Sequence, residues 1–424
     1  MATFHCKLGW ETFCGWNAVK LSNGLLELYV VPEIGGRILQ LRLAERELLY
    51  VNSRHLGHAY SPDENCAAAG WKNYGGSKVW PAPQGWERED QWPGPPDPIL
   101  DGGPYSLEVT AESPESVAVR LESRPDSYSG LTLAREIRLR ANSSSVEIIH
   151  MMRNCSARTV RWGIWQVTQQ DARRGLVAHV RATRHRQMFG DRPFDNVHLD
   201  SNTHLWTLNY ADQVAKFAVE AEQGWIVAVR AEEMIALVET FPLFPGRRYP
   251  DGAPVELWVN GRGTFTLPTG QVDSEADPNG CDPYVETEIL SPLVELEPGE
   301  EFTFPIAWHA TQACNRSVAE VTEAALVSVP LRAVPERGQV RVTGSFGVFQ
   351  TGLLELDVVT ADGRSLAAHQ LGEVSPSSAR QIDHRLVLPA KAVALKLFLK
   401  NSDGRMATEL AEARLEEENA SNAG

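Results

Sequence analysis

The chain has 424 residues, of which 43% are hydrophobic and 22% charged, and this ordinary globular composition excludes a mainly disordered protein. Its formal net charge of -15 at pH 7 offers no basic patch for phosphates, so we expect neither nucleic acid nor a membrane surface as a partner. The N-terminus lacks a signal-peptide pattern and no long apolar run occurs, which predicts a cytoplasmic protein.

Short segments with alternating apolar and polar residues, bounded by Gly, Pro, Asn and Asp, predict antiparallel strands from the start of the chain. The first of these segments are 19–21, 25–31, 38–43 and 47–51. Asn23-Gly24 lies between two of them and predicts a hairpin with a type I′ turn, because both central positions of that turn need a positive φ. Gly35-Gly36 predicts a turn or a bulge at the next strand.

Residues 61–105 form a long segment rich in Pro and Gly that predicts an irregular excursion from the strands. Four tryptophans fall in it, at positions 71, 80, 86 and 92. Indole rings stack on sugar rings but also fill hydrophobic cores, so both interpretations stay open. Beyond the excursion, strands are predicted at 105–110, 117–122, 132–140, 146–154, 161–169, 206–210, 215–221, 225–230, 235–241, 255–260 and 284–290.

The C-terminal part predicts a second, smaller β domain. A helix is expected at 315–327, where apolar residues recur at helical spacing, followed by a proline-containing linker at 329–338. Strands are then predicted at 340–343, 353–359, 384–388 and 393–399. We therefore predict an all-β fold with a large domain at 1–328, a small β domain at 335–415 that packs on it or mediates self-association, and a disordered tail at 416–424.

No pattern for a cofactor or a metal is present. The six cysteines are scattered without C-x-x-C pairs or nearby histidines, which predicts reduced thiols. H-E-x-x-H, calcium-loop, G-x-G-x-x-G and Walker patterns are also absent from the sequence. A G-x-S-x-G elbow is missing as well, so a serine hydrolase is not expected. The sequence therefore predicts a protein that works without a cofactor.

Three segments resemble the aldose 1-epimerase (galactose mutarotase) superfamily. The clearest is Tyr284-Val-Glu-Thr-Glu-Ile-Leu-Ser-Pro292, followed by the turn Leu296-Glu-Pro-Gly-Glu-Glu-Phe302. Asn73-Tyr-Gly-Gly-Ser-Lys-Val-Trp80 is similar to the family's loop at the mouth of the site. The stretch from Asn154 to Gln166 is similar to the strand that carries the family's catalytic histidine. The resemblance spans roughly residues 15–328 and implies a large antiparallel β-supersandwich that acts on a sugar.

The resemblance implies that Glu286 is the general base. Tyr74 and Trp165 stand about where the family has its two histidines, so the general acid must differ. Alternation along a strand puts Glu286 and Glu288 on one face, about 6–7 Å apart. Like charges that close raise one another's pKa, so one carboxyl group could stay protonated and serve as the acid. A strand face with both glutamates in water is the structural alternative.

Other candidates are weaker, because each of these residue types also occurs in ordinary structural positions. Lys78 could stabilise a developing alkoxide, and His309 or His204 could replace the missing acid. Arg37 could bind a sugar carboxylate or phosphate, and Gln169 shares a strand face with Trp165 while Gln166 faces the other way. The predicted catalytic residues are Glu286, Glu288, Lys78 and His309, and the predicted substrate-binding residues are Arg37, Tyr74, Trp80, Gln84, Trp86, Trp165, Gln169 and His204.

Three functions remain open for a chain of this kind. The leading hypothesis is a cofactor-independent enzyme of the aldose 1-epimerase type, with a small carbohydrate as its partner. The second is a carbohydrate-binding or sensing module on the same scaffold, because the two histidines are missing. The third is glycoside hydrolysis by the glutamate pair, which ranks last because two carboxylates on one strand lie side by side instead of flanking a bond.

Overall fold

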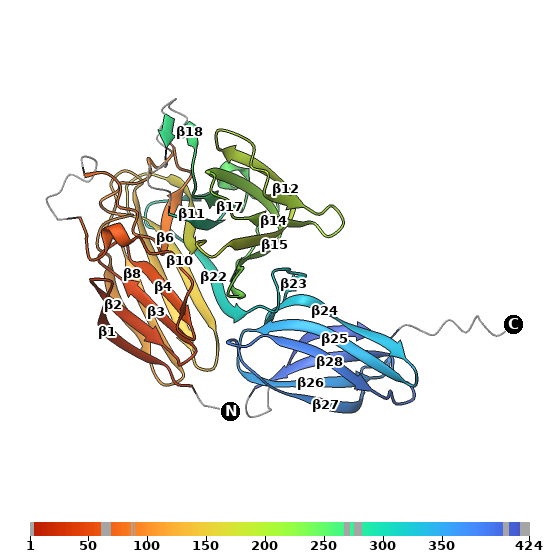
Figure 1. Cartoon of the computed structure of the whole chain (residues 1–424). Coiled ribbons are helices and arrows are strands. Elements are labelled where there is room, and N and C mark those ends of the chain that lie inside the picture. Colours follow the sequence, from red (N-terminus) through yellow and green to blue (C-terminus); the bar gives the residue numbers. More distant parts are fainter. Residues whose placement is uncertain are drawn as a thin grey trace.

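The computed structural model describes residues 4–60, 69–85, 88, 90–266, 272–274, 282–401 and 407–415. Strands make up nearly all of the regular structure in this part of the chain (Figure 1), which confirms the predicted all-β fold. Among these residues no helix is long and apolar enough to cross a bilayer. The predicted tail at 416–424 lies outside the described residues.

The described part of the first 312 residues contains β1 to β22 and two short 3₁₀ helices. The strands are β1 (Lys7–Phe13), β2 (Trp16–Ser22), β3 (Leu26–Val31), β4 (Arg37–Leu43), β5 (Arg46–Glu47), β6 (Ser77–Ala82), β7 (Ser106–Glu112), β8 (Ser116–Glu122), β9 (Leu131–Arg140), β10 (Ser145–Asn154) and β11 (Val160–Asp171). They continue with β12 (Leu176–Phe189), β13 (Val197–Leu199), β14 (Leu205–Asn209), β15 (Ala215–Arg230), β16 (Ile235–Thr240), β17 (Val255–Val259), β18 (Thr264–Thr266), β19 (Val272–Ser274), β20 (Tyr284–Leu290), β21 (Val294–Leu296) and β22 (Glu301–Gln312). The 3₁₀ helices are η1 (Ser53–His55) and η2 (Pro250–Gly252).

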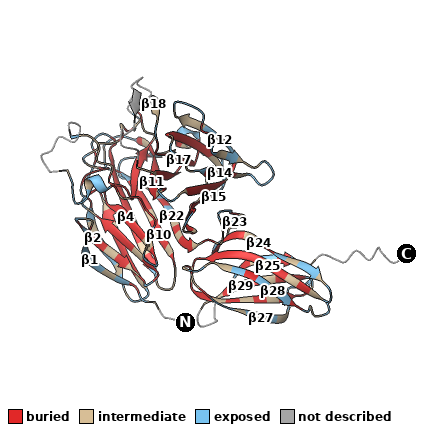
Figure 2. Ribbon diagram, in the orientation of Figure 1, coloured by how far each residue is buried: buried red, intermediate tan, exposed pale blue. Residues whose placement is uncertain are grey.

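Apart from β18 and β19, which pair with each other, the strands described in this domain form one continuous antiparallel sheet that folds back on itself. Pairing runs from β1 through β2, β3, β4 and β6 to β11, then through β20, β17, β15, β16 and β22 to β10, β9, β8 and β7. Leucines and valines of β2 and β3 share one buried cluster with those of β8 and β9, so the two ends of the sheet pack face to face. Figure 2 shows this buried interior in red through β4, β10 and β11.

Residues 313–415 form a separate sandwich of two four-stranded sheets, which occupies the lower right of Figure 1. Its core of leucines and valines is distinct from that of the large domain. The strands are β23 (Glu320–Val321), β24 (Ala325–Glu336), β25 (Gln339–Val348), β26 (Gly352–Val359), β27 (Ser365–Val374), β28 (Arg380–Leu386), β29 (Ala394–Lys400) and β30 (Ala407–Arg414).

The structure corrects two predictions in this region. The expected helix at 315–327 is a turn followed by strands, because the side chains of Asn315 and Thr322 accept backbone hydrogen bonds locally and the apolar run that follows pairs with β25. The expected linker at 329–338 is also strand, since β24 extends to Glu336 and a tight turn at Arg337 and Gly338 joins it to β25. Pro330 is accommodated where the pairing register shifts.

The small domain packs on the large one. The backbone oxygen of Phe349 accepts hydrogen bonds from Ser144 N at 2.8 Å and from the hydroxyl of Ser144 at 3.1 Å. Its ring lies in a buried cluster with Trp225 and Val238 of the large domain and Leu326 of the small domain. The junction is therefore a built interface, with apolar burial and satisfied backbone groups.

Two further predictions need correction in the large domain. Asn23-Gly24 does connect β2 and β3, but the turn is not type I′, because its two central residues are Gly24 and Leu25 and only Gly24 has a positive φ, of 79°. The supposedly irregular segment 61–105 contains the central strand β6. This strand shows no alternation because all six of its residues are buried.

Candidate functional site

Five neighbouring strands carry the candidate site. In the order β6, β11, β20, β17 and β15 they pair antiparallel, so cross-strand partners point to the same face. Glu286 pairs with Gln169 on one side and with Trp258 on the other. Glu288 pairs with Glu256, two residues farther along the same face. The side chains expected on one face of β20 therefore meet charged residues of strands distant in sequence.

Glu286 is held by two donors on its Oε1 atom. Lys78 Nζ lies 3.2 Å from this oxygen, and Gln169 Nε2 donates to it at 2.7 Å. The Glu286 side chain keeps 12% of its surface exposed, whereas the Lys78 side chain keeps only 1%. Oε2 receives none of the hydrogen bonds found among the described residues, so the second oxygen can accept a proton from a ligand.

Glu288 belongs to a buried charge cluster with Lys216 and Glu256. Lys216 Nζ lies 2.7 Å from Glu256 Oε2 and 3.0 Å from Glu288 Oε2. The same Glu288 oxygen accepts a hydrogen bond from Trp165 Nε1 at 2.8 Å. The Glu288 side chain is fully buried and that of Glu256 is 1% exposed, so water does not screen these charges.

The cluster contains one more carboxylate than it has cations, and this excess sets its protonation. Burial raises the pKa of Glu288 to about 8, with Lys216 opposing the shift and the charges of Glu256 and Glu286 adding to it. Burial also raises the pKa of Glu256, while the two carboxylates together outweigh burial and raise the pKa of Lys216. The cluster therefore contains a charged lysine and a carboxyl group that stays protonated at neutral pH.

Among the described residues, three buried oxygen atoms on this face have no hydrogen-bond partner. They are Gln169 Oε1, Glu288 Oε1 and Glu256 Oε1. Buried polar atoms are usually hydrogen-bonded, and each exception asks for a partner. Hydroxyl groups both donate and accept, so a polyhydroxylated ligand would satisfy the amide oxygen, an ionised carboxylate and a protonated carboxyl group alike.

Indole rings form a wall beside the carboxylates. Trp80 lies 5.4 Å from Trp165 and 5.1 Å from Trp92, measured between ring centroids. Lys78 Nζ lies 4.1 Å from the ring centre of Trp80, and Lys216 Nζ lies 4.5 Å from that of Trp165. Burial lowers the pKa of Lys78, with Glu286 opposing the shift. The predicted residues Lys78, Trp80, Trp165, Gln169, Glu286 and Glu288 are thus gathered on one face.

Arg37 has a different position from the one expected. It is fully buried and forms an ion pair with Asp101, while its Nε donates to the Ile34 backbone oxygen at 3.0 Å. Asp101 also accepts hydrogen bonds from Trp71 Nε1 at 3.0 Å and Trp80 Nε1 at 3.2 Å. Arg37 and Asp101 therefore orient the indole wall from behind, and the guanidinium group is not presented to a sugar.

Substituting Gly35 should damage this support. Gly35 has φ +77°, and a Cβ there would overlap the backbone oxygen of Asp101. Gly246 has the same φ but open space around it, so Gly246→Ala measures the backbone strain alone, about 1–2 kcal/mol. Gly35→Ala is expected to lower the free energy of unfolding, measured by urea titration, clearly more than Gly246→Ala. Equal losses in the two variants would contradict the close approach of Gly35 to Asp101.

The opposite face of β20 carries a second buried network. Thr287 and Thr168 donate to the carboxylate of Glu239, and the Gln166 side chain lies 3.3 Å from it. Burial raises the pKa of Glu239 to about 7. The predicted alternation is observed here, because Gln166 faces Glu239 while Gln169 faces Glu286. This network lies under the site, inside the sandwich, and links β11, β16 and β20.

Other predicted residues lie elsewhere. His309 sits at the domain junction, 2.7 Å from Ser145 Oγ and stacked on Phe349, and burial lowers its pKa to about 4. Its strand pairs with β10 and β16 instead of β20, so the structure does not bring it to the carboxylates. His204 lies in an exposed turn and pairs with Glu222 at 2.9 Å.

The remaining binding candidates lie at the margin of the site or outside it. Tyr74 is buried in a separate aromatic cluster, with its ring edge-on to Trp16 and 5.3 Å from the Arg37 guanidinium. Gln84 forms an isolated bridge with Trp92, beyond the end of β6. Trp86, Cys66 and Cys281 lie outside the described residues.

Sequence analysis missed Lys216, Glu256 and Asp101. Lys216 and Glu256 each occupy a position between apolar residues in a strand, in Ala-Lys-Phe and Val-Glu-Leu. Lys and Glu are almost never fully buried unless they are paired, so this placement was an available signal. Among the described residues no group of three His, Cys, Asp or Glu side chains is arranged to hold a metal ion.

Several solved structures are similar to this chain. A TPR-domain containing protein from Parabacteroides distasonis is 13% identical with a TM-score of 0.47, covering 70% of this chain but only 47% of that one, so the chain spans about half its length. A galactose mutarotase-like protein from Clostridium acetobutylicum is 10% identical with a TM-score of 0.42, covering 73% of this chain and 99% of that chain. A galactose mutarotase-like protein from Lactobacillus casei is 10% identical with a TM-score of 0.43, covering 69% and 99%.

Galactose mutarotase-like proteins are thus among the solved structures that this chain resembles, as the sequence predicted. Among curated proteins no match to the sequence is found. Residues 17–311 match the model of a family described as a domain of unknown function, DUF4380. This match covers more than half of the chain, and the chain therefore belongs to the DUF4380 family.

Proposed function

We propose that this chain binds a carbohydrate at Glu286 and interconverts the anomers of a sugar without a cofactor, as an enzyme of the aldose 1-epimerase type. The observation that carries the proposal is the pairing, on one strand face, of a partly exposed carboxylate at Glu286 with a buried carboxyl group at Glu288, whose pKa burial raises to about 8. The unpaired oxygen atoms of Gln169, Glu288 and Glu256 and the indole wall support a polyhydroxylated ligand.

The reaction needs one base and one acid. Glu286 takes the proton from the anomeric hydroxyl, the carbonyl group forms at the anomeric carbon, and the bond from that carbon to the ring oxygen breaks. Glu288 gives its proton to the ring oxygen as the bond breaks. Rotation about the adjacent carbon–carbon bond and the reverse steps give the other anomer, with both protons returned. Lys78 stabilises the negative charge that develops on the anomeric oxygen.

The pH dependence of the rate tests the role of Glu288. Its pKa of about 8 keeps it protonated at neutral pH, and raising the pH through this value removes the proton that it must donate. We therefore expect kcat/KM, corrected for the uncatalysed reaction, to fall as the pH rises through about 8. Glu288→Gln should lose most of the activity, and its residual rate should not show this fall.

The acid could instead be Lys78, whose pKa burial lowers. If Lys78 donates the proton, Glu288→Gln keeps the decline at alkaline pH, and Lys78→Met removes it. A decline that persists in Glu288→Gln would therefore contradict the assignment of Glu288 as the acid and leave the assignment of Glu286 intact.

Anomer exchange can be measured directly by saturation-transfer NMR on a panel of aldoses and their acidic, phosphorylated and amino derivatives. The proposal predicts exchange above the buffer rate for at least one member of the panel, lost in the Glu286→Gln variant. Buffer rates across the whole panel would refute the enzymatic function.

A second candidate function is binding without turnover. It is favoured by Tyr74 and Trp165 standing where the resembled family has histidines, and by the hydrogen bond that ties Trp165 to Glu288. Calorimetric titration with the same sugars separates the two candidate functions. A receptor site would bind a sugar in both the natural chain and the Glu286→Gln variant, and the natural chain would show no anomer exchange. The cytoplasmic location and a partner other than nucleic acid or membrane stay predictions from the sequence.

A further inference from the structure

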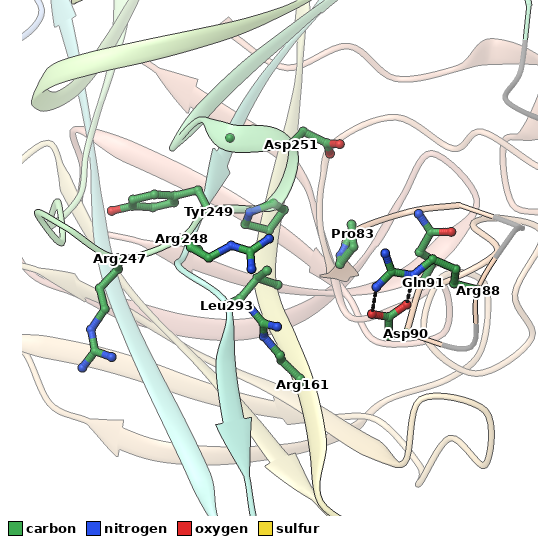
Figure 3. A pocket seen from close by; sticks show the side chains of 12 residues that line it. Pro83, Arg88, Asp90, Gln91, Arg161, Arg247, Arg248, Tyr249, Asp251 and Leu293 are labelled. Carbon is green, nitrogen blue, oxygen red and sulfur yellow. Dashed lines mark hydrogen bonds and ion pairs between the residues drawn. The ribbon is translucent and has the colours of Figure 1, made fainter.

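A concave surface lies at the end of β6 and the start of β11. It is a pocket of about 460 Å³, shown in Figure 3. The side chains that decide its chemistry are the arginines 88, 161, 247 and 248 and the aspartates 90 and 251. Leu293 forms part of the floor, and its backbone N–H donates to the Arg248 oxygen at 2.8 Å.

The charge of this pocket is opposite to that of the chain. Four arginines face two aspartates in a protein whose net charge is -15. Arg88 and Asp90 neutralise each other through an ion pair, with the Arg88 Nε donating to Asp90 Oδ1 at 2.7 Å. The hydrogen bond from Arg88 lowers the pKa of Asp90, and the positive charge of Arg161 adds to this effect. Positive charge therefore remains in excess across the pocket.

Arg161 and Arg248 are the two arginines placed to use that charge. Neither guanidinium group has an ion pair or side-chain hydrogen bond within the described part of the chain. Figure 3 shows both of them next to Leu293, with Arg247 directed away from the pair. Two adjacent guanidinium groups repel each other and attract a group that carries several oxygen acceptors.

The pocket lies along the same strand face as the carboxylate site. Its arginines are too far from Glu288 to bind the same sugar ring. Arg161 lies on β11, at an even number of residues from Trp165 and Val167, so all three belong to one strand face. Val167 pairs with Glu288, and six residues along a strand span roughly 20 Å. At the other end of the pocket, the charge of Asp251 adds to burial in raising the pKa of Glu256. The pocket and the site therefore lie along the same face of β11, with Asp251 close to the carboxylate cluster.

We propose that this pocket binds the anionic group of a second sugar unit, so that the ligand class is an acidic oligosaccharide carrying carboxylate, sulfate or phosphate groups. This inference rests on the proposed carbohydrate function of the Glu286 site. The sugar ring held at Glu286 lies at one end of the ligand, and Arg161 and Arg248 hold a charged group farther along it.

Calorimetric titration of the full chain with matched tetrasaccharides tests the proposal. Each neutral tetrasaccharide of the panel is compared with uronic-acid, sulfated and phosphorylated forms of the same backbone and linkage. We expect at least one acidic form to bind about tenfold or more tightly than its neutral partner, since hydrogen bonds between charged partners are the strong ones. The form that gains most identifies the anionic group, and the advantage should shrink at high ionic strength.

The double variant Arg161→Gln/Arg248→Gln should remove this advantage and leave the affinity for the neutral tetrasaccharide within about twofold. Arg332→Gln, an exposed arginine in the small domain, serves as the matched control and should change neither affinity. Equal binding of neutral and acidic forms, unchanged in the double variant, overturns the anionic subsite while the carbohydrate site stands. If an acidic tetrasaccharide needs the two arginines for binding but is unaffected by Trp165→Ala, the proposed carbohydrate site is wrong. If no tetrasaccharide binds, both the carbohydrate site and the anionic subsite are wrong.

Discussion

Replacing Glu286 with glutamine is expected to lower the catalysed rate of anomer exchange by about 10²- to 10⁴-fold, which is the usual contribution of a positioned general base. The amide keeps the size of the side chain and can still accept from Lys78 and Gln169 through its oxygen, but it cannot take a proton. Saturation-transfer NMR gives the exchange rate, and calorimetry gives the affinity. The affinity should change far less than the rate, because the change removes chemistry and leaves the indole wall in place.

The variant should also remain folded. Burial lowers the pKa of Lys78, and the Glu286 charge opposes this shift. Without that charge the pKa of Lys78 falls further, so the lysine can become neutral instead of remaining an unpaired buried charge. Glu301→Gln, at an exposed position at the start of β22, is the matched control and should leave exchange unchanged. Full exchange in a folded Glu286→Gln protein would show that this carboxylate is not the base.

Much of the fold could be predicted from local patterns. Alternation located most strands of the large domain, because antiparallel strands with one buried face repeat every two residues. Alternation did not locate β6, because its residues are buried on both faces. At 315–327, three apolar residues at helical spacing predicted a helix, but the stretch contains β23 and the start of β24. In both places a contact with a distant strand decides the structure, and no local pattern contains that information.

The site shows the same division. Glu286, Glu288, Trp165 and Gln169 could be placed on one face from alternation within their own strands. Lys216 could not, because its distance to Glu288 depends on the order β20, β17, β15, in which neighbours in space are far apart in sequence. Arg37 was misjudged for a related reason, since its partner Asp101 lies 64 residues away.

Lys216→Met is expected to be the most destabilising substitution in the site. It leaves Glu256 and Glu288 buried without their shared cation, and breaking a buried ion pair from one side usually costs about 3–5 kcal/mol. Urea unfolding at neutral pH gives the change in the free energy of unfolding. The loss should shrink as the pH falls, because Glu288 is already protonated at neutral pH and protonation of Glu256 removes the remaining uncompensated charge.

Lys396 provides a matched control in the small domain. It also bridges two glutamates, at 2.9 Å from Glu409 and 3.4 Å from Glu412, but these three side chains are 27–41% exposed. Water screens such charges, so Lys396→Met should lower the free energy of unfolding far less than Lys216→Met. At a pH high enough to ionise Glu288, adding Glu288→Gln to Lys216→Met should restore part of the stability, because it then removes one of the two unpaired charges. Equal losses in the Lys216 and Lys396 variants, with no rescue, would mean that the Glu288 cluster is hydrated. Glu288 would then lose the burial that holds its proton at neutral pH.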